Sequence, residues 1–320
     1  MSNQKWVTVS PTPLPTRCKD LLRSIGDLVE FDNRTAADFA VALRTADAAI
    51  ARGDTIFDET RLSQCGRLKV IGRTGVGVEL VDLQAATRRG IPVVVTPNAN
   101  SAAVAEGAMA MILTLVKRLG DLDSLVRSGE WEQRDMVRVG DIEGSVFGIV
   151  GLGSIGRRVA DIAHVFKADV LAYDPMASAD VPDWIEMVPL EILAERADIT
   201  SIHAPGGPKT QGLIGDSFFG HAKRGMILVN LARGSVLDES ALLRALDDGI
   251  VAAAGLDVMQ HEPPLSSDPL LARHDVLLSP HKLALSEGAT AQVFGAAATG
   301  IVDVALGRRP ATVANPEVFR

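Results

Sequence analysis

The chain has 320 residues, a formal net charge of −8 and 47% hydrophobic residues, of which few are aromatic. This length exceeds the usual limit of one hydrophobic core, so we expect two domains with cores built mainly of Ala, Val, Leu and Ile, as α/β proteins with buried parallel strands require. The acidic balance argues against binding to nucleic acid, which needs a basic footprint. An anionic ligand therefore needs locally placed arginines.

The cysteines and the apolar segments limit the cellular setting. Cys18 and Cys65 lie far from any Cys/His cluster and are too few for a disulfide framework, so we expect no metal site and a reduced, cytoplasmic protein. Residues 1–16 lack an apolar core flanked by positive charge, so no signal peptide is expected. Residues 101–118 are apolar on nearly every face, but they contain Glu106 and barely reach spanning length. We interpret them as a helix buried between domains or subunits, not in a membrane.

In the first hundred residues, short apolar runs alternate with helical stretches. We expect strands at residues 6–9, 28–31, 48–51, 68–71 and 93–95. This alternation predicts a small α/β layer.

A glycine-rich segment lies near the middle of the chain. Residues 146–150 form an apolar run suited to a buried strand, and Gly151, Gly153 and Gly156 follow it before helical spacing over residues 157–166. In such a unit the first glycine permits a tight turn, the second lets backbone approach a pyrophosphate, and the third lets helix and strand pack closely. The segment therefore predicts a dinucleotide site.

A carboxylate follows the next expected strand. That strand covers residues 169–173 and ends at Asp174. A carboxylate there can accept hydrogen bonds from the ribose hydroxyls and repels a 2′-phosphate. The pattern therefore favours NAD over NADP.

The second half of the chain continues the alternation. Strands are expected at residues 199–202, 226–230, 252–256 and 276–278, with a helix at 239–246, and right-handed crossovers would join them into one doubly wound sheet. Residues 286–320 contain a helix-like stretch, 289–306, but are too short for a domain, so we expect them to return to the N-terminal layer. The expected domains are residues 1–99 plus 287–320, and residues 100–286.

Three polar residues follow successive expected strands of the second domain. Arg233, Glu262 and His281 come after the strands at 226–230, 252–256 and 276–278. Ligands of open α/β sheets bind at the carboxyl ends of strands, so one cleft can contain all three. An arginine can clamp a carboxylate, a histidine can exchange a proton near neutral pH, and an acid beside the histidine stabilises its charged form. This set suits hydride transfer at the carbinol carbon of a 2-hydroxy acid. Taken singly, each of the three is also compatible with an ordinary loop residue.

Several motifs follow one another along the chain: residues 70–78 (VIGRTGVGV), 85–92 (AATRRGIP), 151–156 (GLGSIG), 229–239 (VNLARGSVLDE), 255–258 (GLDV), 262–264 (EPP) and 279–281 (SPH). In this order they resemble the D-2-hydroxyacid dehydrogenase family, and most closely its D-3-phosphoglycerate dehydrogenase branch. The resemblance implies a doubly wound parallel-sheet NAD-binding (Rossmann) domain inserted in a smaller flavodoxin-like α/β substrate domain.

The resemblance also implies roles for individual residues. Arg233 would bind the substrate carboxylate and carbonyl, His281 would donate the proton during reduction, and Glu262 would be its partner. The remaining substrate contacts implied are Arg52, Arg73, Val76, Gly77 and Asn100. The cofactor contacts implied are Val76, Gly151, Gly153, Ser154, Ile155, Gly156, Asp174, Ala204, Leu231, Ala232, Asp257 and Ala284, with Ser154 and Ile155 at the pyrophosphate and Asp257 at the nicotinamide amide.

Two features depart from the branch. Lys282 and Leu283 replace a small-residue run after the histidine, so Leu283 could narrow the nicotinamide or substrate pocket and Lys282 could disfavour a charged histidine. The chain also ends where the second domain closes, so we expect no C-terminal regulatory domain and no feedback by serine.

The resemblance leaves the substrate open. Arg52 and Arg73 align with arginines near the distal phosphate of D-3-phosphoglycerate, and Arg134 lies in a segment that can reach across a homodimer. If the arginines line the cleft, a phosphorylated acid fits; if they face solvent, glyoxylate or hydroxypyruvate fits better. Formate dehydrogenase pairs its histidine with a glutamine, so Glu262 counts against it. A corepressor that senses NAD remains an alternative from another class, although the chain lacks Pro/Ser-rich tails.

Overall fold

The computed structural model describes residues 5–32, 37–53 and 55–320. Residues 1–4, part of the segment 1–16 in which no signal peptide is expected, lie outside the described residues. The chain divides into two compact units. Unit 1 comprises Met1–Asn100 and Leu285–Arg320, and unit 2 comprises Ser101–Ala284. These limits differ by one or two residues from the domain boundaries that we expected.

Unit 1 contains a parallel five-stranded sheet in the order β2-β1-β3-β4-β5, the order of flavodoxin-like folds. Its strands are β1 (Trp6–Ser10), β2 (Gly26–Glu30), β3 (Ala48–Ala51), β4 (Val70–Arg73) and β5 (Val93–Val94). Each lies within two residues of an expected strand, because each is a short apolar run between polar segments.

Helices cover both faces of this sheet. One face packs against α1 (Thr16–Arg23) and α11 (Glu287–Ala305), and the other against α2 (Ala37–Leu43), α3 (Glu59–Gln64) and α4 (Leu83–Arg88). The final segment joins unit 1 through α11, whose Ile301 lies against Gly72 of β4, and through an antiparallel bridge between Val94 and Val313. The chain closes with the short 3-10 helix η4 (Pro316–Phe319).

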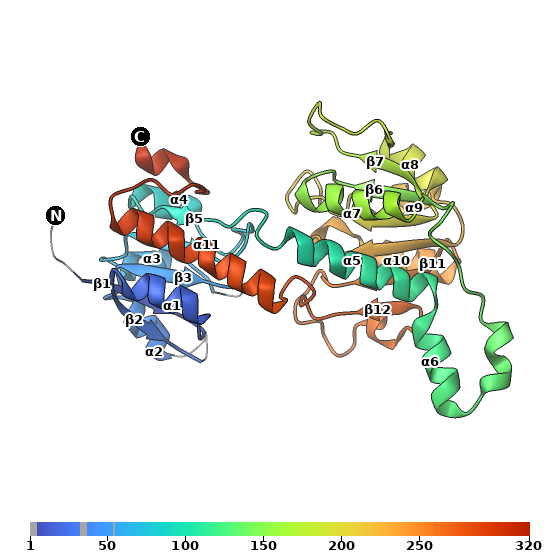
Figure 1. Cartoon of the computed structure of the whole chain (residues 1–320), viewed down its shortest axis with the longest axis horizontal. Coiled ribbons are helices and arrows are strands. Elements are labelled where there is room, and N and C mark those ends of the chain that lie inside the picture. The colour runs from blue at the N-terminus through green and yellow to red at the C-terminus, as the bar shows by residue number, and fades with distance from the viewer. Residues whose placement is uncertain (1–4, 33–36, 54) are drawn as a thin grey trace. The chain divides into compact units, whose positions relative to one another are not determined.

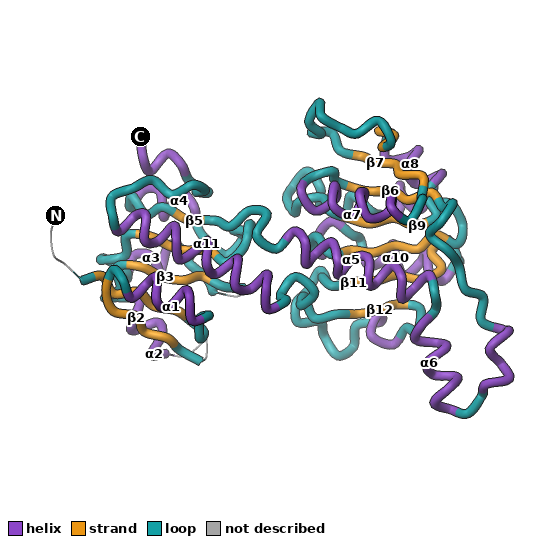
Figure 2. Tube along the Cα trace, viewed as in Figure 1, coloured by secondary structure: helices purple, strands orange, loops and turns teal. Residues whose placement is uncertain are grey.

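Unit 2 contains a parallel seven-stranded sheet in the order β12-β11-β10-β9-β6-β7-β8. Figure 2 shows its strands in orange and its helices in purple. Its strands are β6 (Val146–Val150), β7 (Asp169–Tyr173), β8 (Ile185–Met187), β9 (Ile199–Ile202), β10 (Met226–Asn230), β11 (Val251–Leu256) and β12 (Val276–Leu278). The order reverses between β6 and β9, which makes a topological switch point. Strand β8 was not predicted, because this edge strand has three residues of which only Ile185 is buried.

The helices of unit 2 also form two layers. The first consists of α5 (Ser101–Val116) and α7 (Ser154–Val165), and the second of α8 (Leu190–Arg196), α9 (Asp216–His221) and α10 (Glu239–Asp247). The short 3-10 helices η2 (Gly234–Val236) and η3 (Pro269–Ala272) lie in loops after β10 and β11. None of the helices in the described part of the chain has the length and apolarity to cross a membrane.

The apolar helix α5 corrects an expectation. We expected residues 101–118 to be buried between domains or subunits, but α5 packs against α7, β10 and β11 of its own unit. Ten of its sixteen residues are buried, seven of them in this core, and Ala102, Glu106 and Ala110 form an exposed stripe. The apolar character of α5 is therefore explained within one unit and does not require a second subunit.

A helical arm follows α5. It consists of α6 (Leu119–Ser128) and the 3-10 helix η1 (Trp131–Met136), and Figure 1 shows it extending away from the sheet of unit 2. No residue of either helix is buried. The arm therefore exposes apolar side chains, including Leu119, Val126, Trp131 and Met136.

Candidate active site

The glycine-rich turn between β6 and α7 is packed backbone against backbone. Gly151 has φ +94°, and a Cβ added there would lie 2.7 Å from the nitrogen of Ala204, which follows β9. A Cβ added at Gly156 would lie 2.0 Å from the carbonyl oxygen of Gly151. At Gly153 no atom lies within 4 Å of such a Cβ. The outer glycines therefore close the turn, while Gly153 leaves space beside the backbone for a ligand.

Helix α7 begins immediately after this turn, at Ser154, three residues before the helical spacing was apparent in the sequence. No side chain caps its first turn. A helix N-terminus without a side-chain cap offers backbone N–H groups and a positive dipole end to an anion. The turn and the first residues of α7 therefore fit the pyrophosphate of a dinucleotide.

Asp174 connects the end of β7 to the same turn. Its Oδ2 accepts a hydrogen bond from the N–H of Leu152 at 2.9 Å, and its Oδ1 accepts one from the N–H of Met176 at 2.8 Å. These bonds fix the carboxylate beside the glycine turn, where its remaining lone pairs can accept hydrogen bonds from ribose hydroxyls.

Arg233 is held at the end of β10 by Asn230. This buried amide donates from Nδ2 to the carbonyl of Arg233 at 3.0 Å and accepts at Oδ1 from the N–H of Ala232 at 3.0 Å. The aliphatic part of Arg233 lies on Gly206, since a Cβ added there would be 2.9 Å from Arg233 Cγ. The arginine is thereby placed beside the segment that follows β9.

His281 and Glu262 form a direct pair. His281 Nδ1 lies 2.8 Å from Glu262 Oε2, and Glu262 Oε1 accepts a hydrogen bond from the N–H of Met259 at 3.0 Å. The hydrogen bond to Glu262 raises the pKa of His281, even though Lys282 is next in the chain. Burial would raise the pKa of Glu262, but the hydrogen bonds from His281 and Met259 hold it below its usual value. The charge of Arg233 lowers the pKa of both groups.

Backbone contacts bring the three loops together. A Cβ added at Gly234 would lie 2.0 Å from the carbonyl oxygen of Met259, so the segment after Arg233 touches the segment before Glu262. The N–H of His281 donates to the carbonyl of Asp257 at 2.8 Å, and Asp257 Oδ1 accepts from the N–H of Lys282 at 2.9 Å. Arg233, Glu262 and His281 therefore occupy the carboxyl ends of three neighbouring strands, β10, β11 and β12.

The other predicted contacts of unit 2 border these groups. Ala204, Leu231 and Asp257 are buried, Ala284 packs on the core between α5 and α7, and Ile155 and Ala232 are half-buried. Leu283 also packs on that core, against Leu231 and Gly107.

The predicted contacts of unit 1 other than Asn100 lie at or after the carboxyl ends of β3 and β4. Arg73 ends β4; it donates from Nε to the carbonyl of Gly77 at 2.9 Å and from Nη1 to that of Ala51 at 3.5 Å. Arg52 follows β3, with its guanidinium 5.7 Å from the centre of the Phe294 ring. The loop after β4 exposes Val76, and Asn100 is the last residue of the first segment of unit 1.

Some residues that shape the site were not predicted. Asn230 orders the Arg233 loop and the backbone of Met259 holds Glu262, but neither had a distinctive signal in the sequence. His203 is half-buried as a whole residue; burial of its ring lowers its pKa to about 3, and its Nε2 lies 2.8 Å from Ser201 Oγ. Gly107 had a weak signal, because a glycine inside a helical pattern often marks a close contact.

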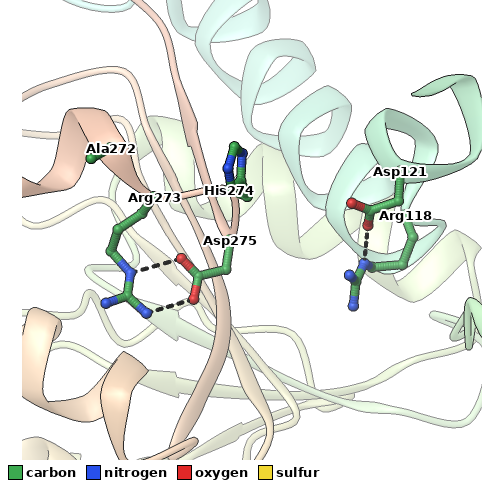
Figure 3. A pocket seen from close by; sticks show the side chains of 6 residues that line it. All are labelled: Arg118, Asp121, Ala272, Arg273, His274 and Asp275. Atoms are coloured by element: carbon green, nitrogen blue, oxygen red, sulfur yellow. Dashed lines mark hydrogen bonds and ion pairs between the residues drawn. The ribbon is translucent and has the colours of Figure 1, made fainter. Parts of the chain in front are cut away.

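An open pocket of about 420 Å³ lies elsewhere in unit 2 and contains none of the predicted residues (Figure 3). Arg118, Asp121, Ala272, Arg273, His274 and Asp275 line it. Its arginines are already paired, Arg273 with Asp275 at 2.7 Å and Arg118 with Asp121. We therefore assign no anion site there. Among residues 5–32, 37–53 and 55–320, no group of His, Cys, Asp and Glu side chains could hold a metal ion.

Comparison with known proteins decides the family. The model of the D-isomer specific 2-hydroxyacid dehydrogenase NAD binding domain matches residues 109–282, which are more than half of the chain and most of unit 2. The chain belongs to the D-isomer specific 2-hydroxyacid dehydrogenase family. NAD is the cofactor of this family's matched domain, and the glycine turn and Asp174 of this dehydrogenase-family chain fit it.

Individual relatives support the same family. The chain is 36% identical to the D-3-phosphoglycerate dehydrogenase of Sus scrofa over 99% of this chain and 60% of that relative, so it spans less than two thirds of that relative's length. The TT0316 protein of Thermus thermophilus is a structural neighbour with a TM-score of 0.90 and 29% identity, covering 96% of this chain and 99% of that one. A glyoxylate reductase from Paecilomyes thermophila has a TM-score of 0.86 and 25% identity, covering 97% and 98%.

Proposed function

We propose that this protein is an NAD-dependent dehydrogenase that interconverts a D-2-hydroxy acid and its 2-keto acid. The observation that carries the proposal is the pairing of His281 with Glu262 under the charge of Arg233, within the unit that holds the glycine turn. The glycine turn and Asp174 would hold NADH, which would supply the hydride for the carbonyl carbon, and His281 would supply the proton for the carbonyl oxygen. Arg233 binds the carboxylate and polarises the carbonyl.

The His281–Glu262 pair serves both directions of this reaction. A protonated imidazole is needed to donate to the carbonyl oxygen, and a neutral one is needed to accept the proton during oxidation. Because Glu262 raises the pKa of His281, the protonated form persists to higher pH than for an isolated histidine.

We propose D-3-phosphoglycerate as the substrate. The relative from Sus scrofa is named for it, and Arg52 follows β3 while Arg73 ends the neighbouring strand β4, as two cations that recognise one phosphate should. A glyoxylate or hydroxypyruvate reductase is the second candidate. It is favoured by the bonds of Arg73 to the carbonyls of Gly77 and Ala51, which already occupy part of its guanidinium.

NADH oxidation against a panel of 2-keto acids tests the substrate. We expect 3-phosphohydroxypyruvate to give the highest kcat/KM, above hydroxypyruvate, glyoxylate and pyruvate. In the variant Arg52→Ala the advantage of the phosphorylated acid should shrink, while turnover of glyoxylate stays the same. If glyoxylate exceeds 3-phosphohydroxypyruvate in the wild type, the second candidate is correct. If no acid is turned over although NADH binds, the protein is an NAD-sensing binding module instead.

The variants Arg233→Ala and His281→Ala test the assigned roles. Each should lower kcat/KM by at least about 100-fold, because each removes a group that acts on the developing charge. NADH affinity, measured by fluorescence titration, should change little. Near-normal turnover by either variant contradicts the role of that residue.

We also propose that the protein is a homodimer, with the arm of α6 and η1 in the interface. Leu119, Val126, Trp131 and Met136 are each more than half exposed within one chain. Apolar side chains gathered on a protruding element are typical of a protein–protein interface. The supporting feature is therefore the arm, not the apolar helix α5.

We propose a cytoplasmic location. Cys18 and Cys65 are both buried free thiols, and burial raises the pKa of each. Unpaired cysteines suit a reducing compartment. Fractionation of cells with an antibody against the protein should find it in the cytoplasmic fraction, and its recovery from an oxidising compartment would overturn the assignment.

A further inference from the structure

Gly107 lies in the middle of helix α5, where no larger side chain fits. A Cβ added at Gly107 would lie 2.7 Å from Leu283 Cβ, 3.3 Å from Leu231 Cδ2 and 3.4 Å from Leu283 Cδ1. The closest of these atoms is the first carbon of a side chain, which cannot move unless its backbone moves. Even alanine at this position would therefore displace one of the two segments.

The two leucines belong to the loops that carry the catalytic groups. Leu231 precedes Arg233 by two residues, and Leu283 follows His281 by two residues. Asn230 is hydrogen-bonded to the backbone of Ala232 and Arg233 in the first loop. Asp257 accepts hydrogen bonds from the N–H groups of His281 and Lys282 in the second loop. A displacement of either leucine is therefore passed through short, hydrogen-bonded segments to the guanidinium or the imidazole.

Helix α5 is the part that stays in place. Its buried residues pack on α7, β10 and β11, whereas Leu283 is only partly buried and Lys282 is exposed. Close-packed interiors transmit strain to the neighbours that are less constrained. A side chain at position 107 would therefore push the segment after His281.

We propose that Gly107 and Leu283 are a size-matched pair of positioning residues that sets His281 against Glu262. Leu283 occupies the space that the missing side chain of Gly107 leaves, and this contact fixes where the His281 loop rests. The assignment rests on the proposed dehydrogenase function for its effect on turnover. It also gives Leu283 a place in the packing of unit 2, where the sequence suggested only an effect on pocket width.

The variant Gly107→Ala tests the pair by activity. It should lower kcat/KM by roughly 10- to 100-fold, as expected for small displacements of a catalytic group, with little change in the Kd of NADH. Gly220→Ala is the matched control: Gly220 is a helical glycine of the same unit, and no atom lies within 4 Å of an added Cβ. It should leave kcat/KM unchanged.

Removing the opposing side chain should restore activity. In the Gly107→Ala background, Leu283→Gly should recover most of the lost kcat/KM, because it removes the carbon that the new Cβ meets. Leu283→Ala retains that carbon and should restore little. If the double variant with glycine is no more active than Gly107→Ala alone, the proposal is wrong.

A second measurement does not depend on turnover. Titration of the His281 ring followed by NMR should give a raised pKa in the wild type, a pKa closer to the ordinary histidine value in Gly107→Ala, and a raised pKa again after Leu283→Gly is added. An unchanged His281 titration in a folded Gly107→Ala protein would overturn the positioning role. Because this result stands even if no acid is turned over, failure of the pair and failure of the proposed function are distinguishable.

Discussion

At the scale of the residue, His281 combines an uncommon backbone with two fixed contacts. Its φ is +51°, a left-handed conformation that non-glycine residues adopt infrequently and often at functional sites. Asp257 holds its backbone and Glu262 holds its ring. The orientation of the imidazole therefore depends on the main-chain carbonyl of Asp257 and on the carboxylate of Glu262, and only the contact with Glu262 also stabilises the proton on the ring.

The variant Glu262→Gln should move the pH dependence in a defined direction. Loss of the negative partner lowers the pKa of His281, so the protonated form is lost at lower pH. The alkaline limb of kcat/KM for keto-acid reduction, and the acid limb for oxidation, should both shift to lower pH, and kcat for reduction should fall by about 10- to 100-fold at neutral pH. An unshifted profile would show that Glu262 does not act on the proton of His281.

Asp174 allows a similar test of cofactor choice. Asp174→Asn replaces the carboxylate with an amide of nearly the same shape that carries no charge, so the repulsion of a 2′-phosphate is lost. The ratio of the Kd values for NADPH and NADH should fall by roughly tenfold, which corresponds to about 1.4 kcal/mol. Fluorescence titration of both cofactors measures it. A constant ratio would mean that another group sets the preference.

At the scale of the element, an aspartate joins three strands at the amino end of each sheet. In unit 1, Asp47 N–H donates to the carbonyl of Val7 at 2.8 Å, and its Oδ2 accepts from Val7 N–H at 3.0 Å. Lys69, just before β4, donates from its N–H to the Asp47 carbonyl at 2.8 Å and pairs through Nζ with Oδ1 at 3.1 Å. The single residue thus connects β1, β3 and β4.

Asp198 repeats this arrangement in unit 2. Its Oδ2 accepts from the N–H of Val146 at 2.9 Å, its carbonyl accepts from the N–H of Ile227 at 2.9 Å, and its Oδ1 pairs with Lys223 at 2.5 Å. The difference is burial, since the side chain of Asp47 is 1% exposed and that of Asp198 is 38% exposed. Removing one partner of an ion pair costs more when that partner is buried than when it lies near water.

The variant Asp47→Asn should therefore destabilise the protein more than Asp198→Asn. At neutral pH we expect Asp47→Asn to lower the free energy of unfolding by about 2 kcal/mol, and Asp198→Asn by less than about 1 kcal/mol. Urea unfolding of both variants measures the difference. Equal losses would contradict the argument from burial.

The contribution of Asp47 should also depend on pH. Although burial opposes it, hydrogen bonds and the charges of Lys69 and Arg67 lower the pKa of Asp47 in the folded protein. The stabilisation is therefore present above the unfolded pKa and is lost as pH falls through the lowered folded value. The difference in the free energy of unfolding between the wild type and Asp47→Asn should shrink when urea unfolding is repeated at increasingly acidic pH. A difference that does not change with pH would show that ionisation of Asp47 is not its source.

At the scale of the whole molecule, each unit covers its own sheet, and the arm is a protruding element without a buried residue. The core of unit 2 includes α5, so the exposed apolar side chains of α6 and η1 are what a second subunit would cover. Val126 and Trp131 lie on the two helices of the arm and are each 57% exposed.

The double variant Val126→Asp, Trp131→Asp should be a monomer. Charged side chains at both positions make burial of the arm unfavourable, and neither side chain contributes to a core within the chain. Light scattering coupled to size exclusion should give the mass of a dimer for the wild type and of a monomer for the variant, with unchanged circular dichroism. A monomeric wild type would contradict the dimer, and a dimeric variant would place the interface elsewhere.

Local patterns in the sequence determined most strands and the cofactor turn. Six strands lie at the predicted residues, because a buried parallel strand has a continuous apolar sequence. They are β3, β6, β7, β9, β10 and β12. The glycine spacing and Asp174 could also be predicted, because Gly151 and Gly156 lie close to other backbone atoms and Asp174 accepts hydrogen bonds from nearby backbone N–H groups. That Arg233, Glu262 and His281 lie near one another could be predicted, because the strand ends on one edge of a parallel sheet converge.

The tertiary structure alone decided which side chains meet. Three contacts illustrate this: α5 packs within its own unit, Arg73 donates to the carbonyls of Gly77 and Ala51, and Leu283 packs against Gly107. In each, the partners are far apart along the chain or are brought together by the conformation of a loop. The periodicity of a single segment does not predict such a contact. Close packing of the whole unit determines it, because each side chain occupies the volume that residues distant in the sequence leave free.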